Sequence, residues 1–502
     1  MRITTNHPLA IVFVAYTVAC TGLANAQGRP IDWPNYGGDA QRTGWEKSDS
    51  RITKENIKDF RLVLKRKLDN GRGGPYSLTP PVVIGNLISY RGFKELAFVA
   101  GSSGKLWSID ADLERIFWEK QVGAPPSGEC ADRVTAIPAL TPPLNFAAGR
   151  PRPAAGNAPT RPPGRTGGTA FGAPRPVFVL AADGKIHQLN SSTGEDEFPP
   201  LNFLPPNAKA SSLTLHDGVL YTTTSSDCGG APAGVWAIGL DETDPKPASY
   251  LLKGATTGGL GGFAIGVDGA VFVQTKAGSV GTLIALTPKD LKVKQSFTVP
   301  GLGAFDGSVT PVVFDWKGRE MVVSGGKNGS LYLLDGQALG GGDQKTPLYQ
   351  TAPLSSKGVW GGLSSWQDTD GTRWVLAPVW GALNSDLKSL LTDGEAPNGS
   401  IIAFKVEEQQ GKPRLTPVWV SRDMSSPEPP VITSGVLFAL AAGERTHAIL
   451  HALDAATGKE MYSTADQVTA PGNLTGLTVA NGRVYFTTTD GTLYAFGIFL
   501  ER

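Results

Sequence analysis

The chain has 502 residues, among them 63 glycines and 38 prolines, and it carries a formal net charge of +1 at pH 7. Glycine and proline make up about a fifth of the chain, which is below the roughly 25–30% typical of a chain that is disordered throughout. A net charge so close to zero does not favour a nucleic acid as partner. We therefore expect a folded protein that binds no nucleic acid.

The first 26 residues have the three parts of a signal peptide. Arg2 supplies a positive charge, residues 9–20 are largely apolar, and residues 24–26 (Ala-Asn-Ala) match a small-x-small cleavage site. The apolar stretch is shorter than the about 20 residues of a transmembrane helix, and no later segment is long enough. We expect a periplasmic or secreted protein with no transmembrane segment. Lipidation at Cys20 is the alternative, which Thr17 disfavours.

One strand-like phrase returns along the mature chain, with a turn glycine followed by alternating apolar residues. It occurs eight times, as Gly104-KLWSID, Gly184-KIHQLN, Gly234-VWAIGL, Gly281-TLIALT, Gly329-SLYLLD, Gly399-SIIAFK, residues 449–454 (ILHALD) and Gly491-TLYAFG. Strand-like segments precede and follow the phrase, which gives four short strands for each repeat. This is the pattern of a propeller blade. The sequence predicts an all-β, eight-bladed β-propeller over residues 27–502.

Blade eight lacks its outermost strand, because the chain ends soon after the eighth phrase. Residues 60–68 (FRLVLKRKL) read as a strand that has no blade of its own. We expect this N-terminal strand to complete blade eight and to close the ring, which removes an open sheet edge.

Two insertions interrupt the regular spacing of the repeats. Residues 142–176 are rich in proline, glycine and arginine and contain no acidic residue, which predicts a flexible insertion. Residues 381–398 form a second insertion, within blade six.

Two cysteines remain after removal of the signal peptide, Cys130 and Cys228. An even pair in an exported protein predicts a disulfide, here between blades two and three. The alternative is two separate thiols.

Residues 33–45 (WPNYGGDAQRTGW) and the strand-like segment that follows are similar to the start of pyrroloquinoline-quinone (PQQ) alcohol dehydrogenases. With the Asp-Ala-Ala-Thr-Gly-Lys turn at residues 454–459, the resemblance covers nearly all of the mature chain. It implies a propeller of the quinoprotein alcohol dehydrogenase type. Non-enzymatic relatives share the repeat, including a propeller lipoprotein of outer-membrane assembly, so the repeat alone assigns no chemistry.

The resemblance also implies where a quinone site would lie. Lys327, in Gly-Lys-Asn-Gly, matches the family phrase whose cation bonds the quinone oxygens; the alternative is a surface lysine in a turn. Asp306 stands where the catalytic base is expected, without the family's Trp and first Asp. Asp227 is the carboxylate nearest to the position of a missing Ca²⁺-ligating Asn, and it also reads as an ordinary turn residue. The family's adjacent cysteines are absent.

Trp360 and Trp380 belong to a segment with four tryptophans, which predicts a flat stacking surface near the funnel of the propeller. Blade-core packing is the alternative for at least two of the four tryptophans.

The Lys327 motif is the one motif of the family's site that this sequence retains, and one motif does not make an active site. The sequence therefore favours an exported module that binds a small molecule or a protein at its funnel, without a cofactor. One alternative is a diverged PQQ- and Ca²⁺-dependent alcohol or sugar dehydrogenase, and the other is an envelope-assembly scaffold that binds extended peptides.

Overall fold

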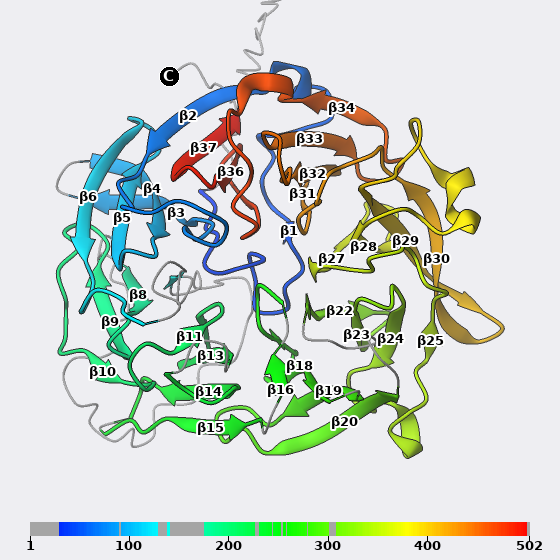
Figure 1. The fold of residues 1–502 in the computed structure, drawn as a ribbon, viewed down its shortest axis with the longest axis horizontal. Helices are drawn as coiled ribbons and strands as arrows, with labels where there is room; N and C mark the ends of the chain where they lie inside the picture. Colours follow the sequence, from blue (N-terminus) through cyan, green and yellow to red (C-terminus); the bar gives the residue numbers. More distant parts are fainter. Residues whose placement is uncertain are drawn as a thin grey trace, which may run out of the picture.

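The computed structural model describes residues 30–498, except 90–91, 129–137, 141–174, 226–229, 243, 253–254, 258, 279 and 301–307. Eight sheets of four or five strands surround a common axis (Figure 1), which confirms the predicted all-β, eight-bladed propeller. The predicted signal peptide, the predicted Cys130–Cys228 disulfide and most of the 142–176 insertion lie outside the described residues. Within the described ranges, no helix is long and apolar enough to cross a bilayer.

The blades follow one another in chain order. Blade one is β3 (Val82–Ser89), β4 (Gly92–Ala100), β5 (Lys105–Asp110) and β6 (Arg115–Gln121), and blade two is β7 (Ala139–Leu140), β8 (Pro176–Leu180), β9 (Lys185–Asn190) and β10 (Leu201–Asn202). Blade three is β11 (Lys209–Ala210), β12 (Thr214–His216), β13 (Val219–Ser225), β14 (Gly234–Gly239) and β15 (Ala248–Leu251). Blade four is β16 (Ala255–Thr257), β17 (Ala264–Ile265), β18 (Val271–Ala277), β19 (Val280–Leu286) and β20 (Val293–Pro300).

The second half of the ring has the same plan. Blade five is β22 (Val312–Trp316), β23 (Arg319–Gly325), β24 (Leu331–Asp335) and β25 (Tyr349–Gln350), and blade six is β27 (Ser364–Gln367), β28 (Arg373–Trp380), β29 (Gly399–Gln409) and β30 (Lys412–Val420). Blade seven is β31 (Val431–Thr433), β32 (Val436–Ala441), β33 (Ile449–Asp454) and β34 (Glu460–Ser463), joined by β1 (Trp45–Glu46), and blade eight is β35 (Thr478–Ala480), β36 (Arg483–Thr487), β37 (Thr492–Gly497) and β2 (Arg61–Lys67). A parallel pair, β21 (Val309–Thr310) and β26 (Gly361–Gly362), and four 3₁₀ turns, η1 (Ile57–Asp59), η3 (Gly341–Asp343), η4 (Ser385–Leu390) and η5 (Ala465–Gln467), complete the described elements.

The eight repeated phrases form the third strand of each blade, from β5 in blade one to β37 in blade eight. Neighbouring blades cover both faces of these strands, which is why their side chains are almost all buried: in β37 all six residues are buried. Strands alternate in direction within a blade. The turn between the second and third strands and the crossover to the next blade therefore share one face of the ring, which we call the crossover face; the other connections lie on the hairpin face.

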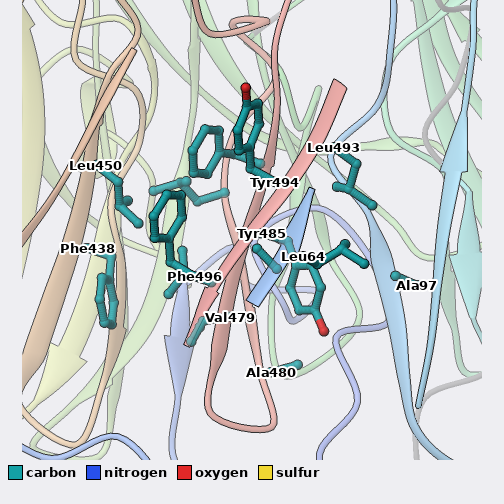
Figure 2. Packing of buried hydrophobic residues seen from close by; sticks show 14 of the residues in the cluster. Leu64, Ala97, Phe438, Leu450, Val479, Ala480, Tyr485, Leu493, Tyr494 and Phe496 are labelled. Atoms are coloured by element: carbon teal, nitrogen blue, oxygen red, sulfur yellow. The ribbon is translucent and has the colours of Figure 1, made fainter. Parts of the chain in front are cut away.

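The N-terminal strand β2 closes the ring, as predicted. It pairs antiparallel with β37, from Arg61 opposite Gly497 to Lys67 opposite Thr492. Leu64 of β2 is only 1% exposed and packs with residues of blades seven, eight and one (Figure 2). Blade eight is thus built from both ends of the chain.

Residues 31–46, which we call the axial segment, run through the middle of the ring (Figure 1). The segment pairs with blade one through Trp33 and Val83, and with blade seven through β1 and β31. Inner strands of five blades donate backbone N–H groups to its carbonyls over 2.7–3.0 Å: Leu140 to Pro34, Ile265 to Ala40, Val313 to Gln41, Ser365 to Thr43 and Ile432 to Gly44. The axial segment therefore fills the centre of the propeller and ties its blades together, which the repeat pattern did not predict.

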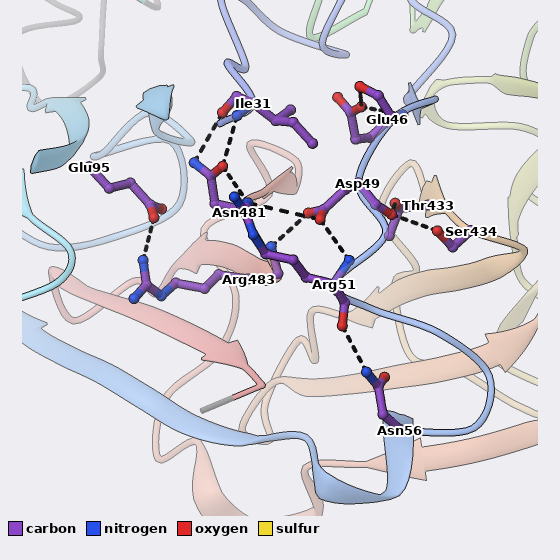
Figure 3. A network of polar contacts seen from close by, with 12 residues as sticks. Ile31, Glu46, Asp49, Arg51, Asn56, Glu95, Thr433, Ser434, Asn481 and Arg483 are labelled. Atoms are coloured by element: carbon purple, nitrogen blue, oxygen red, sulfur yellow. Dashed lines mark hydrogen bonds and ion pairs between the residues drawn. The ribbon is translucent and has the colours of Figure 1, made fainter. Parts of the chain in front are cut away.

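Polar contacts fix both ends of the axial segment on the hairpin face (Figure 3). Asn481 of blade eight bonds the backbone N–H and carbonyl of Ile31 at 2.8 and 3.1 Å. Asp49 lies just after the segment. Its side-chain carboxylate accepts the N–H of Gly482 at 2.6 Å, and its backbone carbonyl accepts the hydroxyl of Ser434 at 2.6 Å. The chain is therefore bound to blades seven and eight before it turns outward into β2.

The insertion at residues 381–398 connects β28 to β29 of blade six and contains η4. Asn384 caps η4 and bonds through its N–H to the carbonyl of Leu354, while the N–H of Thr392 bonds to the carbonyl of Val420 in the outer strand β30. Leu387 is buried in the core between blades five and six. The insertion therefore packs against the outer part of blade six.

Two tryptophans of outer strands bind the turn of the next blade. Trp118 in β6 and Trp419 in β30 donate their indole N–H groups to the carbonyls of Ser191 and Ala455, at 3.0 and 3.2 Å. These carbonyls belong to the Asn190-SSTG and Asp454-AATG turns, the two best Thr-Gly turns of the sequence. A Cβ on Gly458 would lie 2.5 Å from the Trp419 ring, so the turn glycine is needed for this contact.

We expect Gly458→Ala to destabilise the protein by about 2 kcal/mol more than Gly411→Ala, because a clash is added to the backbone strain. Both glycines have positive φ, +72° and +75°, but a Cβ on Gly411 meets nothing within 4 Å. Melting temperatures of the two variants measure the difference. Equal losses of stability would show that Trp419 moves away at no cost.

Candidate functional site

Lys327 lies on the crossover face, in the turn between β23 and β24 of blade five. The crossover from blade five to blade six runs over this turn, and the N–H of Val359 bonds to the carbonyl of Gly326 at 3.1 Å. A Cβ on Gly358 would lie 2.6 Å from both the Cα and the carbonyl oxygen of Lys327. Gly358, with φ +80°, therefore permits the close approach that places the exposed Lys327 beside the tryptophan-rich segment.

Trp360 and Trp380 stack on each other next to this turn. Their ring centroids are 4.6 Å apart and the rings are inclined by 22°. The indole N–H of Trp380 is donated to the carbonyl of Pro427 at 3.0 Å, which fixes its ring from behind. Both side chains are half-buried. Trp380 thus supports Trp360, and a flat ligand has no room between them.

The other two tryptophans of the segment belong to the core. Trp366 and Trp374 are 3% and 2% exposed, and their rings stack at 6.1 Å between blades six and seven. They pair directly across β27 and β28. The four tryptophans therefore divide into a buried pair and a pair at the crossover face.

The remaining predicted site residues, Asp227 and Asp306, lie outside the described residues, as do Cys130 and Cys228. The structure thus places the turn of Lys327 next to the segment of Trp360 and Trp380. The roles of these three residues, of the two aspartates and of the disulfide all stay predictions. In the described part of the chain, no three His, Cys, Asp or Glu side chains gather closely enough to hold a metal ion.

The axial segment places a charged side chain at the centre of the ring. Arg42 is 2% exposed. Its guanidinium donates six hydrogen bonds of 2.6–3.2 Å, all to neutral acceptors: the carbonyls of Tyr36, Gly261 and Phe263, the side-chain oxygen of Asn35, and the hydroxyls of Ser212 and Thr214. Burial lowers the pKa of Arg42 to about 10, against the opposing effect of Tyr36 and Asp39. The guanidinium therefore stays charged at neutral pH and binds blades three and four to the axial segment.

Glu428 is a buried carboxyl group under the crossover face that the sequence did not single out. It is 1% exposed, and its Oε2 accepts the backbone N–H of Gly476 at 2.5 Å, which links the crossovers into blades seven and eight. Its Oε1 and the hydroxyl of Tyr36 have no hydrogen-bond partner among the described residues. Burial raises the pKa of Glu428 to about 7, although the backbone N–H groups of residues 474–476 act in the opposite direction. Burial, then the charge of Glu428, also raises the pKa of Tyr36.

We expect Glu428→Gln to flatten the pH dependence of stability. A carboxyl group whose pKa is raised on folding stabilises the protein below its unfolded pKa, near 4.5, and this contribution is lost as pH rises through 7. Wild type should therefore lose about 2–3 kcal/mol relative to the variant between pH 4.5 and 7.5, as measured by urea unfolding.

Glu460→Gln is the matched control, because the stability that Glu460 contributes depends on pH in the opposite direction. Partial burial acts to raise the pKa of Glu460, but the hydrogen bond from His451 and the charges of His451 and Arg422 lower it overall. Its contribution is present above the unfolded pKa and is lost as pH falls. Parallel pH profiles for wild type and Glu428→Gln would contradict the assignment.

Solved structures share the arrangement of the whole ring. The quinohemoprotein alcohol dehydrogenase from Comamonas testosteroni has a TM-score of 0.57 at 14% identity, covering 95% of this chain and 82% of that chain. A europium-containing methanol dehydrogenase has a TM-score of 0.57 at 13% identity, covering 94% and 99% of the two chains. At these identities the similarity shows the fold alone.

A family model matches the last part of the sequence. Residues 397–498, from β29 to the end of blade eight, match the PQQ_2 family model, described as "Outer membrane protein assembly factor BamB". The chain is an eight-bladed β-propeller whose residues 397–498 carry the PQQ-type repeat. No curated protein matches the sequence of this propeller.

A complete PQQ site needs a cation, a flat surface and oxygen ligands for a metal ion. The propeller offers the first two at Lys327 and Trp360. The rings of Trp360 and Trp380 leave no slot for a quinone between them, and the candidate carboxylates Asp227 and Asp306 lie outside the described residues. The described residues therefore supply only the cation and the flat surface of such a site.

Proposed function

We propose that the chain is an exported binding module, which takes a small molecule or a protein segment on its crossover face at Lys327 and Trp360. The observation that carries this proposal is the half-buried Trp360, which is stacked on Trp380 in the crossover that runs over the turn of the exposed Lys327. An aromatic ring held in place, with a positive charge next to it, suits a ligand that has both an apolar surface and a negative group.

The centre of the ring supports the same surface. A ligand that approached along the axis would meet the axial segment, whose carbonyls are already bonded to the inner strands of five blades. A ligand on the crossover face would therefore bind at its rim, where the tryptophan pair lies.

The test uses the mature chain, residues 27–502, with PQQ as a flat anionic probe. We expect weak binding whose affinity does not depend on Ca²⁺. Trp360→Ala and Lys327→Ala should each weaken it about tenfold, equivalent to about 1.4 kcal/mol. Calorimetric titration measures the affinity. Lys459→Ala, which removes an exposed lysine on the hairpin face, is the control and should change nothing.

Dye-coupled oxidation assays separate this proposal from a dehydrogenase. We expect no turnover of short alcohols or sugars with PQQ and Ca²⁺ present. Turnover that is lost in Lys327→Ala would overturn the binding-module proposal and establish a diverged quinoprotein dehydrogenase.

A scaffold for envelope assembly is the second candidate, and the family match over residues 397–498 supports it. Strand addition needs a free outer edge. The edge of blade eight is β2, on which Arg61, Lys65 and Lys67 are exposed, and charges of this kind disfavour pairing with a further strand. Strand addition at the edge of blade eight is therefore disfavoured, and the scaffold stays the second candidate.

A further inference from the structure

Three arginine or lysine side chains are buried among the residues that the structure describes: Arg42, Lys94 and Arg373. Arg42 donates to six neutral acceptors, and Lys94 forms an ion pair with Asp110 at 2.6 Å. Arg373, 7% exposed, has neither kind of compensation. Its Nε has no hydrogen-bond partner, and its single described hydrogen bond is a long one, 3.4 Å from Nη2 to the side-chain oxygen of Gln367. Arg373 is thus the exception among the buried cations described.

Aromatic rings hold the Arg373 guanidinium in place at the hairpin face. Arg373 begins β28, and its guanidinium carbon lies 5.6 Å from the ring centroids of both Trp45 and Phe314. Trp45 comes from the axial segment and Phe314 from the inner strand β22 of blade five. The side chain is therefore positioned between two blades and the axis without a carboxylate to hold it there.

A second cation stands beside the same tryptophan. The ammonium group of Lys47, an exposed residue, lies 5.0 Å from the centroid of the Trp45 ring. Neither Lys47 nor Arg373 forms an ion pair within 4.0 Å with any described residue. Two positive charges thus flank Trp45 where the axial segment leaves the ring. The carboxylates of Asp39 and Asp315 act on Lys47 and Arg373, respectively, from beyond ion-pair distance.

Burial of a cation is costly unless hydrogen bonds or a counter-charge compensate for lost water. Burial lowers the pKa of Arg373, and the charge of the exposed Asp315 acts in the opposite direction without reaching ion-pair distance. The aromatic contacts recover part of the cost but satisfy no N–H donor. A group that completes the site must accept hydrogen bonds and carry negative charge.

We propose that Arg373, with Trp45 and Lys47, forms a binding site for an oxyanion on the hairpin face of the propeller. The planar guanidinium presents its donors in a fork that matches a carboxylate or a phosphate group. Trp45 supplies an apolar wall, and Lys47 attracts the anion at the surface. This site is separate from Lys327 and Trp360, which lie on the opposite face, so it does not depend on the proposed function.

The test measures the melting temperature of the mature chain with sodium phosphate or sodium acetate, against sodium chloride at equal ionic strength. We expect phosphate to raise the melting temperature saturably, by about 2 °C or more at a hundredfold excess over Kd. Arg373→Met keeps the apolar stem between the two rings and should abolish the rise. Lys405→Met, which removes another cation 5.1 Å from a tryptophan ring of blade six, should retain it. A matching rise with acetate means that a carboxylate suffices; a rise with phosphate alone means that the site takes phosphate groups.

Asp315→Asn separates an external anion from an internal partner. We expect this variant to bind phosphate at least as tightly as wild type, because a competing carboxylate is removed. Phosphate binding in Asp315→Asn but not in wild type would overturn the proposal, since Asp315 would then be the partner of Arg373. An equal response in wild type and Arg373→Met would overturn it as well.

Discussion

Deletion of residues 27–70 is expected to abolish the cooperative unfolding of the propeller and to cause aggregation. The deletion removes β2, whose pairing with β37 completes blade eight, and exposes the edge of β37. It also removes the axial segment and with it the backbone hydrogen bonds to the inner strands. Calorimetry and light scattering of the truncated chain measure the outcome. A single, unshifted transition of a monomer would contradict this account of closure.

Point variants in β2 isolate the closing strand from the axial segment. Leu64→Asp places a charge at a position that is 1% exposed, within the core of blade eight, and should cost about 4 kcal/mol or more. Lys65→Asp is the matched control on the neighbouring, exposed position, where the loss is a contact with the Tyr494 ring worth about 1 kcal/mol or less. Similar losses in both variants would mean that β2 is not packed as described.

Replacement of Arg42 by methionine is expected to cost about 4 kcal/mol or more. The variant removes six hydrogen bonds to the axial segment and to blades three and four, although the Gly261 carbonyl keeps the Ser212 hydroxyl as a donor. Each buried acceptor left without a donor costs about 1–3 kcal/mol. The methionine side chain fills much of the space beside the Phe263 ring, so the loss is mainly one of hydrogen bonds. Denaturant unfolding followed by tryptophan fluorescence measures it.

Arg373→Met is the matched control for Arg42→Met, because both replace a buried arginine by the same apolar side chain. Arg373 has one long hydrogen bond to lose, and its removal relieves an uncompensated buried charge. We expect a change of about 1 kcal/mol or less in phosphate-free buffer. A large loss in Arg373→Met together with a small one in Arg42→Met would reverse the roles assigned to the two arginines.

The blades could be predicted from the sequence because their third strands are covered on both faces and repeat one apolar phrase. Closure followed from counting strands: β2 had no blade and blade eight lacked a strand. The axial segment could not be predicted in the same way. The segment binds the blades mostly through its backbone carbonyls, so its sequence shows no periodic pattern of side chains. Its partners also lie up to 450 residues away in the sequence, as for Ile31 and Asn481.

Candidate site residues could be identified from the sequence where they belong to a short motif, as Lys327 and the tryptophan segment do. Which tryptophans face the core depends on strand register, and only the pairing of Trp366 with Trp374 distinguishes them from Trp360 and Trp380. Glu428 and Arg373 gave no signal, because a single charged residue in a loop or at a strand end usually lies in solvent. Their burial arises from contacts between blades that the sequence does not encode locally.

The axial segment also sets the order in which the chain can fold. Its residues bond to all eight blades, reaching blade three through Arg42, and β2 pairs with a strand that ends at Gly497. Early blades can form as hairpins from local contacts, but the segment has no complete set of partners until the last blade exists. The axial segment and β2 therefore lack part of their partners until blade eight forms, and we expect their joint capture to be a late step of folding.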